Sequence, residues 1–134
     1  MIRNGGLDGW DWIVGSTYMA QHLDVEPKWM ILVDMVGDTN QQFYLEGNSD
    51  PALSAKIWTT AANLGYGQHF LPLPRYTMED DHIPFRNRGI PAVDIIDFDY
   101  PYWHTMADTA DKVSADSLER VGRTLAAFLQ TTDK

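Results

Sequence analysis

Two mostly apolar runs, Trp29–Val33 and Pro91–Ile96, are the clearest structural signals in the chain. Neither alternates between apolar and polar positions, so both predict strands that other elements cover on both faces. The short segment Phe43–Leu45 is a third strand candidate. Pro72 and Pro74 predict a further extended segment, because the proline ring fixes φ and disfavours a helix.

Amphipathic helices separate these strands. Apolar positions on one helical face predict a helix within Ile13–Leu23 and another from Pro51 to Leu64, which Gly65 would end. Ser114 predicts the cap of a last helix. The inner face of that helix is expected to consist of Leu118, Val121, Leu125, Phe128 and Leu129.

Strands interleaved with amphipathic helices favour an α/β fold in layers. The 134 residues suit a single domain over 1–134 with one core. Three or four strand candidates form a small sheet, and a small sheet leaves at least one edge open to pairing. The organisation therefore resembles part of a larger sheet.

Composition excludes several classes of partner. Ten Lys and Arg stand against 19 Asp and Glu, a formal net charge of −9, which repels nucleic acid and anionic lipid. The absence of cysteine excludes disulfides and cysteine zinc sites. No apolar run is long enough for a transmembrane helix, and Met1–Gly6 lacks the apolar core of an export signal. The compartment is left open.

Side chains that bind metals or move protons stand at the ends of both predicted buried strands. Asp34 follows the first strand, where open α/β sheets place their sites. Asp80, Asp81 and His82 precede the second strand, and His104 follows it in a Trp-His-Thr turn. Such a placement is how an α/β protein brings distant carboxylates and imidazoles together around a metal ion, so these residues are candidate zinc ligands.

Each candidate also has a structural alternative. His104 could hydrogen-bond a loop carbonyl, and Asp34 could cap the next turn, which aspartate favours. Asp80 and Asp81 are adjacent, and neighbours point in different directions, so at most one is expected to face a site. His82 is expected as a core or loop histidine, with a ligand role left open.

The remaining polar and aromatic residues are interpreted mainly as structural. Asp97 and Asp99 are interpreted as loop polar groups. The aromatic cluster Tyr100–Trp103 either lines a pocket for a small ligand or packs against its neighbours. His22 and His69 have no partner pattern and are interpreted as structural.

Five segments together resemble the C-terminal half of the co-catalytic zinc aminopeptidases of clan MH, and most closely their glutaminyl-peptide cyclotransferase-like branch. They are DMVGD from Asp34, DDHIPF from Asp80, RGIPAVDIID, WHT from Trp103 and DTADKVSADSLERVG. The resemblance implies a partial three-layer α/β/α sandwich with a mixed central sheet. It also implies one or two zinc ions, peptide N-termini as substrates and relatives that are often secreted or periplasmic.

The resemblance assigns roles residue by residue. His104 matches a zinc-ligand histidine. Asp34 matches a ligand of the second zinc in the aminopeptidases, or a member of a hydrogen-bond network in the cyclases. Asp80 matches that same network, and with Asp81 it forms the candidate catalytic pair. Trp103 matches a wall of the substrate pocket.

The resemblance also places Trp10 near a second wall of the substrate pocket. Upstream of Trp10, the chain departs from the family pattern. The family carries an acidic pair just before the Gly-rich segment seen here at Asn4–Gly6; one member is the general base and the other binds zinc. Its place falls at about Ile2–Arg3, which can neither accept a proton nor bind zinc. His104 and Asp34 would then supply two ligands where zinc takes three or four.

Two functions from different classes follow. The first is a zinc-dependent aminopeptidase or glutaminyl-peptide cyclotransferase, incomplete and weakly active or inactive as this chain because the catalytic glutamate is missing. The second is a non-catalytic truncated homologue that associates through its exposed sheet edge, with a second copy or with a missing N-terminal half. A third, weaker hypothesis is a metal-binding module that uses His104, Asp34 and His82.

Overall fold

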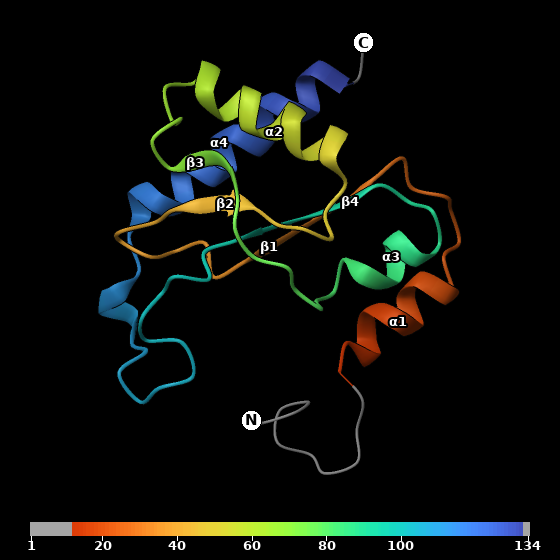
Figure 1. Cartoon of the computed structure of the whole chain (residues 1–134), viewed down its shortest axis with the longest axis horizontal. Coiled ribbons are helices and arrows are strands. Elements are labelled where there is room, and N and C mark those ends of the chain that lie inside the picture. The colour runs from red at the N-terminus through yellow and green to blue at the C-terminus, as the bar shows by residue number, and fades with distance from the viewer. Residues whose placement is uncertain (1–11, 133–134) are drawn as a thin grey trace.

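Helices lie on both sides of a small set of strands in the computed structural model, which describes residues 12–132 (Figure 1). This arrangement confirms the α/β class and the expected layering of helices around strands. A 3₁₀ turn at Ala110–Lys112 precedes the last helix. Along the chain the elements are α1 (Val14–Gln21), β1 (Met30–Asp34), β2 (Phe43–Leu45), α2 (Pro51–Asn63), β3 (Phe70–Pro74), α3 (Ile83–Asn87), β4 (Ala92–Ile96) and α4 (Ala115–Thr132).

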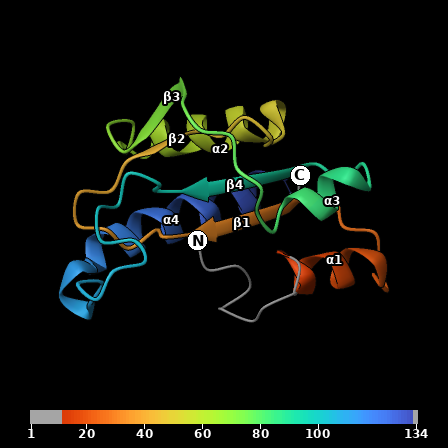
Figure 2. The same cartoon turned by 60° about the horizontal axis from the view of Figure 1, so that its bottom comes forward.

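The strands pair in parallel. β1 lies beside β4, with Met30 opposite Ala92 and Asp34 opposite Ile96. β2 lies beside β3 in a second parallel pair. Parallel strands end at the same edge of a sheet, and Figure 2 shows β1 and β4 pointing the same way. The loops that follow Asp34 and Ile96 therefore leave the sheet at one edge, where sites of α/β proteins form.

Two apolar clusters lie on opposite faces of β4. Its odd-numbered side chains, Val93 and Ile95, join the larger cluster with α2 and α4, while Ala92 joins a smaller cluster with α1 and α3. Alternate strand residues face opposite sides of a sheet, so one strand serves both layers. Each fully buried apolar side chain contributes about 1.5–3 kcal/mol. The larger cluster consists of Phe43, Leu53, Ile57, Trp58, Ala61, Phe70, Val93, Ile95, Val121 and Phe128.

Asp50 ties three elements together at the start of α2. Its backbone N–H donates to the carbonyl of Ala92 in β4 at 2.7 Å. Its Oδ1 accepts from the Leu53 N–H at 2.9 Å, which caps α2, and its Oδ2 accepts from Arg86 of α3 at 2.9 Å. The loop between β2 and α2 is therefore held against β4, which matters for the buried groups described below.

Two local predictions are wrong, and one helix was not predicted. β1 is not covered on both faces, because Val33 is 44 % exposed. On α4, Leu118 and Leu129 are 48 % and 44 % exposed and lie at the margin of the inner face. The helix α3 was not predicted; its five residues begin at Ile83, and Pro84 occupies an early helical position that suits proline.

Candidate active site

Three aspartates lie within electrostatic reach of one another near the end of β1. Asp34 is the last residue of β1, and Asp80 and Asp81 precede α3, where the Asp81 N–H donates to Asp80 Oδ1 at 2.7 Å. Burial raises the pKa of Asp34, the Met35 N–H lowers it, and the charge of Asp81 raises it. The structure thus brings together residues far apart in sequence, although their catalytic and metal-binding roles stay predictions.

Asp80, like Asp34, has a raised pKa. Burial raises its pKa, the Asp81 N–H opposes that, the charges of Asp34 and Asp81 raise it further, and His82 lowers it. A carboxyl with a raised pKa exchanges protons closer to neutral pH than an exposed aspartate does. The backbone after Asp34 is also unusual, since Met35 has a φ of 53°, a left-handed conformation that non-glycine residues rarely adopt.

A second group of titratable residues, Glu46, His82 and Asp94, is buried directly beside the aspartates. The side chains of His82 and Asp94 are fully buried, and Glu46 is nearly so. His82 Nε2 lies 3.2 Å from Glu46 Oε2, and His82 Nδ1 lies 4.0 Å from Asp94 Oδ2. Burial raises the pKa of Asp94 to about 8, and the charges of Asp80 and Glu46 add to the effect.

Sequence reasoning missed Glu46 and Asp94. The signal for Asp94 was present, because it is the one charged residue in the buried strand Ala92–Ile96, and burying a carboxylate is costly. His82 was expected as a core or loop histidine, and it is a core histidine. Asp97 was interpreted as a loop polar group, and it does lie in the loop after β4, but it is 1 % exposed and burial raises its pKa to about 6.

His104 and Trp103 lie in the exposed loop after β4. The His104 ring stacks on Trp103 at 4.1 Å between centroids, and Trp103 packs against Phe98 at 5.2 Å. Phe98 in turn meets Tyr76 at 5.3 Å. His104 has a φ of 56°. Trp103 is 42 % exposed and therefore accessible to a ligand. Its role as a pocket wall stays a prediction.

The described residues do not make up a zinc site. Among residues 12–132, no group of three or more His, Cys, Asp or Glu side chains is placed to hold a metal ion. Catalytic zinc takes three protein ligands and structural zinc takes four. Asp34 and His104 remain predicted ligands, and a complete coordination shell would need groups beyond the described ones.

The other candidates are structural or cannot be placed. His22 stacks on Tyr18, and His69 Nδ1 lies 2.9 Å from the Gln41 carbonyl oxygen. Asp99 accepts from Tyr76 and pairs with Arg75 at 2.9 Å. Trp10 lies outside the described residues.

A search of residues 12–132 finds no helix with the length and apolar character needed to span a bilayer.

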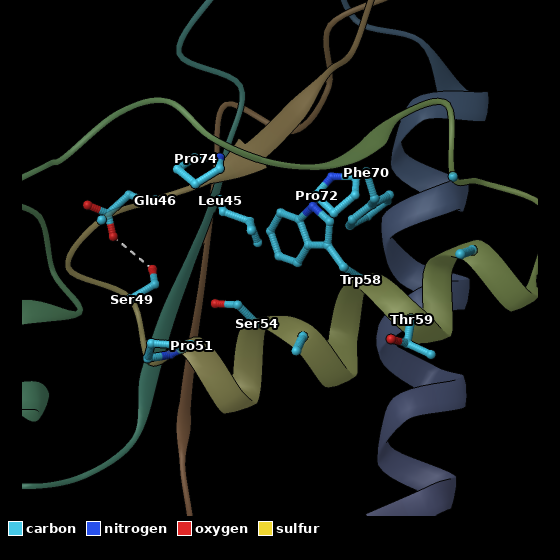
Figure 3. A pocket seen from close by; sticks show the side chains of 14 residues that line it. Leu45, Glu46, Ser49, Pro51, Ser54, Trp58, Thr59, Phe70, Pro72 and Pro74 are labelled. Carbon is cyan, nitrogen blue, oxygen red and sulfur yellow. Dashed lines mark hydrogen bonds between the residues drawn. The ribbon is translucent and has the colours of Figure 1, made fainter.

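One cavity lies between α2 and β3, away from the aspartates. It has a volume of about 610 Å³, and Figure 3 shows Trp58, Phe70, Pro72 and Pro74 along its apolar wall. Asp34, Asp80 and Asp81 do not line it. Glu46 reaches its margin, where Ser49 Oγ donates to Glu46 Oε2 at 2.8 Å (Figure 3).

Comparison with known proteins gives a consistent answer. Residues 11–129 match the model of peptidase family M28. The glutaminyl-peptide cyclotransferase of Gloydius blomhoffii is 28 % identical over 126 residues, which are 85 % of this chain and 33 % of that protein. The chain thus spans about a third of this curated relative.

Two solved structures show the same fold at higher identity. A glutaminyl cyclase from Porphyromonas gingivalis superposes with a TM-score of 0.88 at 33 % identity, covering 98 % of this chain and 53 % of that one. A Zn-dependent exopeptidase from Parabacteroides distasonis superposes with a TM-score of 0.79 at 29 % identity, covering 91 % and 47 %. The chain spans about half the length of both.

Proposed function

Because the chain belongs to peptidase family M28, we propose that Asp34, Asp80 and Asp81 form the acidic part of an active site that acts on peptide N-termini. The observation that carries this proposal is the electrostatic coupling of three carboxyls from β1 and from the turn before α3. The similarity to glutaminyl cyclases and a Zn-dependent exopeptidase supports the substrate class. The reaction is either removal of the N-terminal residue or cyclisation of N-terminal glutamine.

In this proposal Asp80 and Asp81 handle protons and orient the substrate amine. An α-amino group titrates near neutral pH, and a carboxylate cluster attracts its protonated form. Asp80, with a raised pKa, exchanges a proton with the reacting group or with a neighbouring base. Trp103, half exposed on the loop after β4, is the proposed apolar wall for the substrate side chain.

Zinc would take part in this function only if further ligands, which the described residues do not supply, completed its coordination shell. Asp34 offers one carboxylate and His104 one imidazole, and catalytic zinc takes three protein ligands. A bound zinc ion would polarise the substrate carbonyl. We therefore propose that the 134-residue chain alone has little or no activity on peptide N-termini.

A chimera tests the function directly. The part of the Porphyromonas gingivalis glutaminyl cyclase that this chain does not cover is fused to this chain, and cyclisation of an N-terminal glutamine is measured with and without a chelator. We expect chelator-sensitive turnover that falls roughly 100-fold or more in Asp80→Asn, the range lost with a proton-transfer group. Asp116→Asn, in the exposed first turn of α4, is the matched control and leaves turnover unchanged.

Two outcomes would contradict the proposal. One is a folded chimera that neither cyclises N-terminal glutamine nor removes N-terminal residues, or whose turnover Asp80→Asn leaves intact. The other is chelator-sensitive turnover by the 134-residue chain alone, because that would mean it already holds a complete site. If the chimera removes N-terminal residues but does not cyclise glutamine, the proposed active site stands and its reaction is peptide hydrolysis.

The second candidate function is non-catalytic association through the edge of β1. Among residues 12–132, β1 pairs with β4 on one side and with no strand on the other. Met30 and Leu32 of β1 line an apolar groove of about 510 Å³ beside α1. An unpaired apolar strand edge is a template for another chain, either a second copy or a chain equivalent to the part of its relatives that this chain does not span.

Sedimentation distinguishes this candidate from the first. If the edge of β1 pairs two copies, the chain sediments as a dimer, and Val33→Lys, which places a charge on the edge strand, shifts it to monomer. Leu73→Lys on β3, also exposed, is the matched control and leaves the dimer intact. A wild-type monomer with a sharp melting transition would remove the need for an edge partner.

A further inference from the structure

Glu46, His82 and Asp94 have no role in the function proposed above, yet they occupy the core next to it. They come from the loop after β2, the turn before α3 and the middle of β4. The His82 imidazole lies between the two carboxyls, 3.2 Å from Glu46 Oε2 and 4.0 Å from Asp94 Oδ2. One buried ring therefore connects three separate elements.

The two carboxyls are held in opposite states. Glu46 accepts from the backbone N–H groups of Asn48 and Met78 and from the Ser49 hydroxyl. Burial alone would raise the pKa of Glu46, but these donors and the contact with His82 lower it to about 2, so it is ionised. Asp94 has no such donors: neither of its oxygens has a hydrogen-bond partner among residues 12–132.

Burying these polar groups without partners lowers the stability of the fold. Besides the Asp94 oxygens, both ring nitrogens of His82 lack a well-aligned hydrogen bond within residues 12–132. Buried polar groups without partners destabilise a protein, and apolar residues of similar volume often replace buried ion pairs without loss. Such groups call for a functional explanation when they adjoin a site.

We propose that His82 is a positioning residue for Asp80 and Asp81, a buried imidazole that links Glu46 to Asp94 and holds the turn carrying both aspartates against the sheet. The inference rests on the proposed function, because it assigns His82 to the site that Asp80 and Asp81 form. His82 follows the pair directly and opens α3, so its anchoring fixes the direction in which the two preceding side chains leave the turn.

Two further sets of hydrogen bonds hold the segments around His82 in place. The Ser49 hydroxyl donates to Glu46 and accepts from the Asp94 N–H at 2.9 Å, which joins the two carboxyl-bearing segments independently of the ring. Asn48 Nδ2 donates to the Met78 carbonyl at 2.6 Å, two residues before Asp80. The segment that leads into the Asp80–Asp81 turn is thus fixed at Met78 and again at His82.

His82 also acts on Asp80 through charge. The carboxyls of Asp34 and Asp81 raise the pKa of Asp80, and His82 opposes them. The groups that face His82 are Glu46 from the loop after β2 and Asp94 from β4, with Asp80 on its own turn. Removing the imidazole would therefore both loosen the turn and make Asp80 harder to ionise.

The test uses the 134-residue chain without zinc or substrate, so its outcome is independent of whether the chimera is active. Two NMR signals are followed, the Asp81 amide, which donates to Asp80 Oδ1, and the Asp80 carboxyl ¹³C titration. In His82→Gln we expect the Asp81 amide to shift and exchange faster and the Asp80 midpoint to rise. The Leu53 amide, bound to Asp50, stays in place and reports that α2 is intact.

His69→Gln is the matched control, because His69 is a partly buried histidine bound to a backbone carbonyl away from the aspartates. It leaves both signals unchanged. Ser49→Ala, which loosens Glu46 and Asp94 without touching the ring, moves the Asp81 amide in the same direction by less, and replaces His82→Gln should that variant fail to fold. An Asp81 amide and an Asp80 midpoint identical to wild type in the folded variants would overturn the proposal.

Discussion

Asp94→Asn should change how the stability of the chain depends on pH. Asp94 is fully buried, and its pKa is raised from 3.8 to about 8. The folded state therefore keeps a proton that the unfolded state loses, over the window from about pH 4 to about pH 8. Stability falls as pH rises through that window, because deprotonating Asp94 in the folded state is unfavourable.

The size of the effect follows from linkage. One proton held only by the folded state gives a slope of about 1.4 kcal/mol per pH unit. Between about pH 5 and pH 8 the wild-type chain would lose about 4 kcal/mol from Asp94. Asparagine has nearly the same shape and no titrating proton, so Asp94→Asn removes this slope.

Urea unfolding at a series of pH values measures the slope, and Asp97→Asn is the matched control. Asp97 is equally buried, but its pKa is raised only to about 6, so its contribution is confined to lower pH. Above about pH 6 we expect Asp97→Asn to follow wild type and Asp94→Asn to diverge upward. Parallel curves for wild type and Asp94→Asn between pH 6 and pH 8 would refute the reasoning.

Three further predictions concern stability and metal binding. Asp50→Ala removes the cap of α2 and the partner of Arg86 and should cost about 1–3 kcal/mol in urea unfolding; a loss no larger than that of the exposed Asp116→Ala would contradict it. Trp58→Ala, which removes a buried indole packed on Phe70, should cost about 3–5 kcal/mol, and an unchanged urea midpoint would be inconsistent with that packing. Zinc should not raise the melting temperature of the chain, because two predicted ligands are too few; a rise that His104→Ala abolishes would disprove this.

The sequence predicts the fold where periodicity and turn chemistry act locally. The helix α2, which begins at Pro51 and stops before Gly65, and the strand β4, whose five residues are all buried, follow from such patterns. The exposure of Val33 could not be predicted in this way. An apolar run indicates that a strand tends to be buried, but it does not show which element packs on each face. The helix α3 is only five residues long, too short for a periodic signal.

The site is predicted less completely than the fold. Motif spacing pointed to Asp34, Asp80 and Asp81, and the structure brings these three into electrostatic contact. Glu46 lies far from them in sequence and has no motif of its own, so only the folded chain reveals its contact with His82. The position of His104 depends on an irregular loop after β4, which no periodic pattern constrains.

The most direct test of the account is the titration of the Asp34 carboxyl, followed by ¹³C NMR in the wild-type chain and in Asp81→Asn. The account holds that Asp34 and the aspartates before α3 converge, and the charge of Asp81 raises the pKa of Asp34. We predict that Asp81→Asn lowers the Asp34 midpoint, whereas Asp116→Asn leaves it in place. An Asp34 midpoint that does not respond to Asp81→Asn would place the aspartates apart and contradict the proposed site.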